Sequence, residues 1–208
     1  MALKLYHCKG ARSLRALWTL EEMGLPYELE VMEFPPRLRR EGYLAINPLG
    51  TVPTLTDGDI TLTESAAICQ YLVDCYGRDP ANLSPLGLAP GDKDYGPYLN
   101  WLHRSDATLT FPQTIVLRYT QFEPPERRLK QAAEDYTQWF FARLRCVEEA
   151  LATHDYLCAE RFTIADICVG YALVLADRLG LSGGFKSNTE AYYRRLIARP
   201  GYLRAASL

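Results

Sequence analysis

The first third of the chain alternates between strand-like and helix-like patterns of apolar residues. Residues 3–6, Leu-Lys-Leu-Tyr, are predicted to form a short strand, and over residues 11–23 apolar side chains recur at spacings of three and four. Gly24 and Pro26 come next, and a glycine followed by a proline predicts that the helix ends there. Residues 27–31 alternate apolar and acidic side chains, which is typical of a second strand. Two strands joined through a helix in this way are expected to lie parallel.

A hairpin and a further helix are predicted next. Two short strands are expected at residues 52–56 and 59–62, joined by Asp57-Gly58, a dipeptide that favours tight hairpin turns. Helical spacing of apolar residues then covers residues 63–77. With a short connecting helix before the hairpin, the order of elements is β-α-β, α, then β-β-α.

The rest of the chain is predicted to be helical. Several prolines and glycines lie in residues 78–90, which we interpret as an interdomain linker. Beyond the linker, helical periodicity covers four approximate ranges: 92–119, 125–152, 163–179 and 189–198. The sequence therefore predicts an α/β domain over residues 1–77 and an all-α domain over residues 91–208.

The composition is that of an ordinary globular protein of 208 residues, of which 48% are hydrophobic. The 23 basic and 25 acidic residues give a formal charge of −2, which offers no basic surface for nucleic acid or an anionic membrane. No stretch approaches the roughly 18 uninterrupted apolar residues that cross a bilayer. We therefore expect a cytosolic protein with no nucleic-acid or membrane partner.

The six cysteines form no C-x-x-C pair and show no metal-ligand spacing with the three histidines. This pattern predicts reduced thiols and no metal site. Most of these cysteines fall within apolar helical patterns, where a free cysteine behaves as a small hydrophobe. Only Cys8, at the end of the first predicted strand, raises a functional question.

Pro53 stands in an extended, β-branched run, where a residue without an N–H is unfavourable unless the backbone there has another use. In the cis form it would turn the N–H and C=O of Val52 outward, where they could bond an extended peptide. The helix that starts at Glu64 offers open N–H groups and a positive dipole end to a carboxylate, with the Ser65 hydroxyl as a further donor. Glu64 could accept from an ammonium group. The stretch can thus hold the zwitterionic end and the backbone of a short peptide.

The order of these features resembles the cytosolic glutathione S-transferases, and bacterial members in particular. VPTL is followed about ten residues later by ES, after a β-α-β unit and before a helical domain. The likeness extends to AINPLGTVPTL, LTESAAICQYL and RFTIADICVGY, and so covers essentially the whole chain. It implies a thioredoxin-like domain that binds glutathione as co-substrate, with no other cofactor, and a cis peptide bond before Pro53. It also implies a helical domain that supplies the electrophile site, and a homodimer.

The resemblance implies a set of site residues. Glutathione is expected to contact one group of residues in the first domain: Thr51, Val52, Pro53, Glu64 and Ser65. One arginine of the run Arg37-Leu38-Arg39-Arg40, with Arg39 preferred, or else Lys9, is the expected partner of its glycine carboxylate. Aromatic residues of the second domain are candidates for a small, hydrophobic electrophile: Trp101, Phe111 and Tyr119. Two charged residues are candidates to reach the glutathione of a partner subunit: Arg104 and Asp106.

Three side chains near the first helix are candidates to stabilise the glutathione thiolate. We favour the Ser13 hydroxyl, with Arg12 as electrostatic support and the Tyr6 hydroxyl next; alternatively, Ser13 only caps the helix and backbone N–H groups activate the thiol. Thiol-disulfide exchange through Cys8 is a second hypothesis. The cysteine position of the beta class falls on Arg12 here, four residues after Cys8, which weakens that hypothesis. A glutathione-binding protein without activity is the third.

The segment at residues 162–167 is interpreted as structural. Thr163 and Asp166 have the spacing of a capping box, and Phe162 and Ile167 occupy the positions of a hydrophobic staple. The replacement Asp166→Ala is expected to cost on the order of 1 kcal/mol, as for the loss of a helix cap, and to leave glutathione affinity unchanged.

Overall fold

The computed structural model describes residues 3–77 and 85–208, which form two compact units. The first unit comprises Met1–Gly87 and Ile197–Leu208, and the second comprises Leu88–Leu196. Residues 78–84, the greater part of the expected linker, lie outside the described residues.

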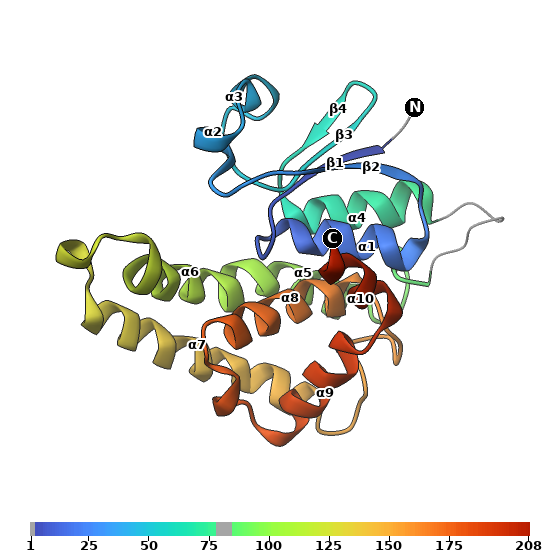
Figure 1. Ribbon diagram of the computed structural model, residues 1–208. Helices are drawn as coiled ribbons and strands as arrows, with labels where there is room; N and C mark the ends of the chain where they lie inside the picture. The colour runs from blue at the N-terminus through green and yellow to red at the C-terminus, as the bar shows by residue number, and fades with distance from the viewer. Residues whose placement is uncertain (1–2, 78–84) are drawn as a thin grey trace. The chain divides into compact units, whose positions relative to one another are not determined.

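The first unit is built on a four-stranded sheet of order β2-β1-β3-β4, shown in Figure 1. Its strands are β1 (Leu3–His7), β2 (Tyr27–Val31), β3 (Thr54–Asp57) and β4 (Ile60–Leu62). Its helices are α1 (Ser13–Met23), α2 (Pro36–Arg39), α3 (Tyr43–Ile46), α4 (Ser65–Tyr76) and α10 (Pro200–Ser207). Strands β1 and β2 are parallel, as the β-α-β pattern predicted, and the other pairs are antiparallel.

The hairpin forms one or two residues later than the sequence suggested. Strand β3 begins at Thr54 because Pro53, just before it, has no N–H to donate to the ladder. Asp57 pairs with Ile60, so the two loop residues are Gly58 and Asp59, and Gly58 has a φ of 57°. The predicted pair of strands is confirmed, and the tight turn is shifted by one residue.

Helix α1 ends where the sequence predicted, at Gly24, which has a φ of 64°. Figure 1 shows α1 and α4 side by side against one face of the sheet, and the two helices are in contact. Every residue of α1 from Ser13 to Leu20 is buried, because β1, α4 and α10 all pack against this helix. Leu17, Trp18 and Leu20 have no exposed surface, and burial of such apolar side chains holds the helix in the core.

The C-terminal helix α10 packs on α1, although the sequence placed all of residues 91–208 in the helical domain and predicted no helix here. The rings of Trp18 and Tyr202 meet edge to face at 5.0 Å. The Arg199 guanidinium donates to both carboxylate oxygens of Glu22, at 2.8 and 2.9 Å. An aromatic contact and a bidentate ion pair, neither readable from local sequence, place residues 197–208 in the first unit.

The second unit consists of helices. They are α5 (Tyr95–Arg104), η1 (Ser105–Thr110), α6 (Phe111–Leu117), η2 (Arg118–Phe122), η3 (Pro125–Arg127), α7 (Lys130–Ala150), α8 (Ile164–Arg178), η4 (Ser182–Gly184) and α9 (Ser187–Ile197). The segments η1 and η2 are π-helical, and η3 and η4 are 3₁₀ turns. Among the described residues, no helix is long and apolar enough to cross a membrane.

Asp166 forms the predicted capping box with Thr163 at the start of α8. Its carboxylate also accepts bonds from outside the cap: from the Leu157 N–H at 3.0 Å and from the Tyr192 hydroxyl at 2.7 Å. Burial raises the pKa of Asp166 to about 6, so the group is ionised at pH 7 and acts only as an acceptor. These contacts agree with the predicted structural role, and the bonds from outside the cap raise the cost that we expect for removal of the carboxylate.

We expect Asp166→Ala to lower the free energy of unfolding by about 3 kcal/mol or more, since it leaves several buried donors without partners. Urea unfolding measures this change. Asp177→Ala on the exposed side of α8 is the matched control, expected to change stability by no more than about 0.5 kcal/mol. A loss below about 1 kcal/mol for Asp166→Ala would contradict the role of the contacts outside the cap.

Candidate functional site

The ends of three strands meet at one edge of the sheet in the first unit. Tyr6 pairs with Thr54, so continuing this antiparallel register brings Cys8 opposite Val52. Leu55 pairs with Leu62, so continuing that register brings Pro53 opposite Glu64. Helices α1 and α4 start just beyond β1 and β4. The residues expected to bind a peptide therefore gather where two helix N-termini open, and such termini attract anions.

A buried polar network holds the loop that precedes β3. The Asn47 amide nitrogen donates to the Thr51 carbonyl at 3.0 Å and to the Thr54 hydroxyl at 3.1 Å. The Tyr43 hydroxyl donates to the same Thr51 carbonyl at 2.6 Å and lies 2.8 Å from the Thr54 hydroxyl. Gly50 turns the loop with a φ of 63°, and a side chain there would meet Arg37 at 2.7 Å. The loop thus has one well-defined conformation.

The loop presents the peptide bond that the sequence singled out. Val52–Pro53 is cis, as the family resemblance implied. Thr51 is exposed, whereas Val52 and Pro53 are buried against the sheet. Phe34–Pro35 is a second cis bond, which the sequence reasoning did not anticipate.

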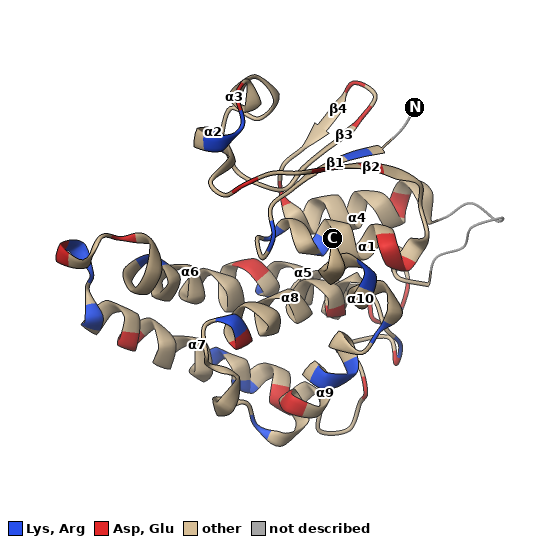
Figure 2. Cartoon of the chain, in the orientation of Figure 1, with Lys and Arg blue, Asp and Glu red and all other residues tan. Residues whose placement is uncertain are grey.

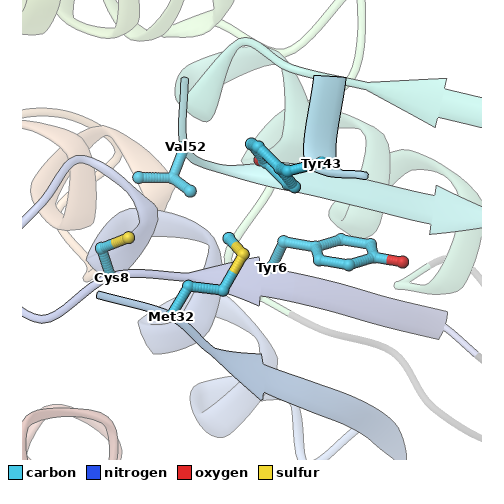
Figure 3. Close-up of a cluster of buried hydrophobic side chains, with 5 residues drawn as sticks. All are labelled: Tyr6, Cys8, Met32, Tyr43 and Val52. Carbon is cyan, nitrogen blue, oxygen red and sulfur yellow. The ribbon is translucent and has the colours of Figure 1, made fainter. Parts of the chain in front are cut away.

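Figure 3 shows Cys8 and Tyr6 in a buried cluster with Met32, Tyr43 and Val52. Cys8 has no exposed surface, and burial raises the pKa of its thiol to about 11. Tyr6 is 7% exposed, and its hydroxyl points away from Cys8 in Figure 3. Neither side chain is presented to a ligand at the strand ends.

Ser13 is also fully buried, at the first position of α1. Its hydroxyl lies 2.8 Å from Nδ1 of His7, and it accepts from the Cys8 N–H at 3.2 Å. Burial lowers the pKa of His7 to about 4, so the imidazole is neutral at pH 7. These bonds fasten the end of β1 to the start of α1. Arg12, one residue earlier, is partly exposed.

The start of α4 is open. Glu64 is exposed at the N-cap position, and in the described part of the chain no side chain caps this helix. Ser65 is buried, and its hydroxyl accepts a hydrogen bond from Nη1 of Arg15 at 2.9 Å. The sequence reasoning overlooked Arg15, although a cation inside the run SLRALWTL was a readable signal.

Two of the basic residues considered for a glycine carboxylate lie together. Arg39 and Lys9 line one cavity of about 500 Å³, with Met32 and Phe34 among the other lining residues. The neighbouring Arg40 instead pairs with Glu30, with 2.9 Å between nitrogen and oxygen. On α7 and α9, by contrast, basic and acidic residues are interspersed (Figure 2).

The aromatic residues predicted for an electrophile site lie in different surroundings within the second unit. Trp101 is 6% exposed, and the Arg104 guanidinium lies 5.1 Å from its ring centroid. Phe111 is 49% exposed and contacts Tyr136 edge to face. Tyr119 lines a cavity of about 660 Å³, whose lining includes neither Trp101 nor Phe111. Asp106, partly buried, lies in the π-helical segment η1.

No group of three or more metal-ligating side chains occurs among residues 3–77 and 85–208. The helix N-termini and the basic side chains at this edge of the sheet determine which kind of ligand it can bind. Open N–H groups, a serine hydroxyl and several basic side chains suit an anionic ligand of peptide size.

Comparisons with known proteins point to one family. The family models "Glutathione S-transferase, N-terminal domain" and "Glutathione S-transferase, C-terminal domain" match residues 11–75 and 110–200. The chain is 31% identical to glutathione S-transferase GstA of Escherichia coli O157:H7, over 95% of this chain and 94% of that protein.

Two solved structures are similar over nearly the full length. One is the glutathione transferase URE2P6 from Phanerochaete chrysosporium in complex with oxidised glutathione, with a TM-score of 0.85, 26% identity, and coverage of 99% of this chain and 94% of that one. The other is a sphingomonad glutathione S-transferase complexed with glutathione, with a TM-score of 0.84, 26% identity, and coverage of 98% and 97%.

The burial of Cys8 predicts that its thiol is unreactive in the folded protein. At pH 8 we expect its alkylation by iodoacetamide to be at least about 100-fold slower than that of an accessible thiol of ordinary pKa. Peptide mapping by mass spectrometry measures the rate, with the exposed Cys75 as internal control. After unfolding, both residues should be alkylated. A glutathione adduct on Cys8 of the native protein, after exposure to oxidised glutathione, would contradict this prediction.

Proposed function

This chain belongs to the glutathione S-transferase family, and we propose that the strand edge of its first unit holds glutathione for transfer to an electrophile. Conjugation of glutathione is the activity that the family models and the relatives support. The observation that carries the proposal is that the strand register brings Val52 and Pro53 to the open start of α4 at Glu64 and Ser65.

The three parts of the tripeptide correspond to three features of this edge. The α-carboxylate of the γ-glutamyl residue binds at the start of α4 and accepts from Ser65, while Glu64 accepts from the ammonium group. The cysteinyl backbone pairs with the backbone of Val52 beside Thr51 and Pro53. The glycine carboxylate lies toward Arg39 and Lys9, which line the cavity of about 500 Å³.

The thiol needs a donor at the start of α1. Lowering a thiol pKa of ~8.5 by about two units requires roughly 2.7 kcal/mol of preferential thiolate stabilisation. One charge-assisted hydrogen bond supplies about 1.5–3 kcal/mol, and a helix N-terminus adds to it. The Ser13 hydroxyl is buried and bonded to His7 and Cys8, which favours Arg12 together with backbone N–H groups as the activating group.

The second unit supplies the electrophile site in this proposal. Exposed aromatic surface at Phe111 and the cavity beside Tyr119 offer contacts for small hydrophobic electrophiles. Trp101, being buried, supports its helix more than it offers surface. Exchange chemistry through Cys8 is not favoured, because that thiol is buried with a raised pKa.

We place the reaction in the cytosol, where conjugation would detoxify reactive compounds. All six cysteines are free thiols. Disulfides are rare in the cytosol, so unpaired cysteines agree with that compartment. Fractionation of the source cells checks the location, and recovery only outside the cytosol would contradict it.

We expect wild-type protein to conjugate glutathione to a halonitroarene and the Arg12→Ala variant to be impaired. Loss of the guanidinium should raise the pKa of the thiol of bound glutathione by a unit or more. At a pH below that pKa, the conjugation rate should fall about tenfold. Titration of the thiolate absorbance of bound glutathione measures the first effect, and a conjugation assay at pH 6.5 the second.

The variants Ser13→Ala and Tyr6→Phe are the controls, and both are expected to leave the pKa of the bound thiol in place. A rise of a unit or more in Ser13→Ala alone would show that the buried hydroxyl is the donor. Absence of glutathione binding by the wild type would refute the proposed function.

A homodimer is expected from the family, and Arg104 and Asp106 are proposed to approach the glutathione of the partner subunit. One chain has a mass of 23.6 kDa. Sedimentation velocity at micromolar concentration should therefore show a species of twice that mass. A monomer as the sole species would refute the assembly and, with it, the contact across the subunits.

A further inference from the structure

Arg15 is a charged side chain with no exposed surface. It lies in the first turns of α1 and is among the largest fully buried side chains of the protein. Its Nη1 donates to the Ser65 hydroxyl at 2.9 Å, so it joins α1 to the first residue of α4 across 50 positions of sequence. A buried cation is costly unless partners compensate for its lost hydration, and the Ser65 hydroxyl is one of the groups that do so.

The chemistry of arginine decides which way the Ser65 hydroxyl works. A guanidinium has five N–H donors and no acceptor, so Ser65 Oγ must accept in this bond. The hydroxyl proton is then directed to a third group. Ser65 is the first residue of α4, where the backbone N–H groups of the opening turn have no intrahelical partners. Hydroxyl and backbone donors are therefore available at the same helix end.

We propose that Arg15 is a positioning residue that makes the start of α4 selective for a carboxylate. It orients Ser65 as a donor, and it sets a permanent positive charge behind the helix end. This inference rests on the proposed function, in which the α-carboxylate of the γ-glutamyl residue binds there. A buried residue then contributes to recognition of the carboxylate, in addition to the exposed cations of the site.

Burial distinguishes this charge from the other cations of the site. Lys9 and Arg39 are both exposed, so salt screens their attraction for a ligand. Arg15 is shielded from solvent, and its interaction with a nearby carboxylate is screened much less. Selectivity that comes from Arg15 should therefore persist in salt.

The test compares glutathione with γ-aminobutyryl-cysteinylglycine, which lacks only the α-carboxylate of the γ-glutamyl residue. Calorimetry gives the dissociation constants of both ligands for the wild type, Arg15→Lys and Arg39→Ala. We expect the wild type to prefer glutathione by about 30-fold or more, as for a carboxylate with charge-assisted bonds. Arg15→Lys should reduce this preference about tenfold and change the affinity for the analogue less than about twofold.

Arg39→Ala is the matched control, because the glycine carboxylate is present in both ligands. It should weaken both by the same factor and leave the preference unchanged. An equal loss of affinity for both ligands in Arg15→Lys would show that Arg15 only supports the fold, and would overturn the inference. Absence of any preference in the wild type would instead overturn the proposed carboxylate site at α4.

A second measurement needs no change at Arg15, should that variant fail to fold. The preference of the wild type for glutathione over the analogue is measured at 0.05 and 0.5 M salt, concentrations that span about 14 to 4 Å of screening length. A preference retained within about twofold supports a buried charge. A preference that collapses toward equality would assign the carboxylate to exposed cations and overturn the inference.

Discussion

The buried amide of Asn47 is the contact on which the binding edge of the first unit most depends. It joins the Thr51 carbonyl to the Thr54 hydroxyl, and the Tyr43 hydroxyl reinforces both positions. Buried polar groups are costly when unpaired, so the loop retains the one conformation that satisfies all of them. The position of Val52–Pro53 and the start of β3 follow from that conformation, and so does the surface offered to a peptide.

Helix α1 carries the other constraints of this unit. Ser13 bonds to His7 at the end of β1, Arg15 bonds to Ser65 at the start of α4, and Glu22 bonds to Arg199 ahead of α10. These bonds lie along one helix, so the sheet, α4 and the C-terminal helix are located by the same element. A rigid arrangement of the two helix starts is what a small anionic peptide needs, because its charged ends are only a few bonds apart.

The burial of a side chain decides whether a group with suitable chemistry can reach a bound ligand. Cys8, Ser13 and Tyr6 all carry chemistry suited to thiols and lie near the expected position, but each is turned into the protein. The Ser13 hydroxyl bonds to His7, whereas Cys8 and Tyr6 pack in a buried cluster. Arg12 is partly exposed, which supports the proposal that its charge and backbone N–H groups at the helix start stabilise the thiolate.

Local patterns in the sequence determined the β-α-β unit, the end of α1 at Gly24, the hairpin and the capping box of Asp166, because each depends on residues a few positions apart. They also determined the family, through VPTL and ES at their spacing. Tertiary structure alone decided that Ser13 is buried, that Arg15 reaches Ser65, that Tyr192 completes the shell of Asp166, and that α10 packs on α1. Those contacts join residues tens to nearly two hundred positions apart, and they exist only once the core has brought the elements together.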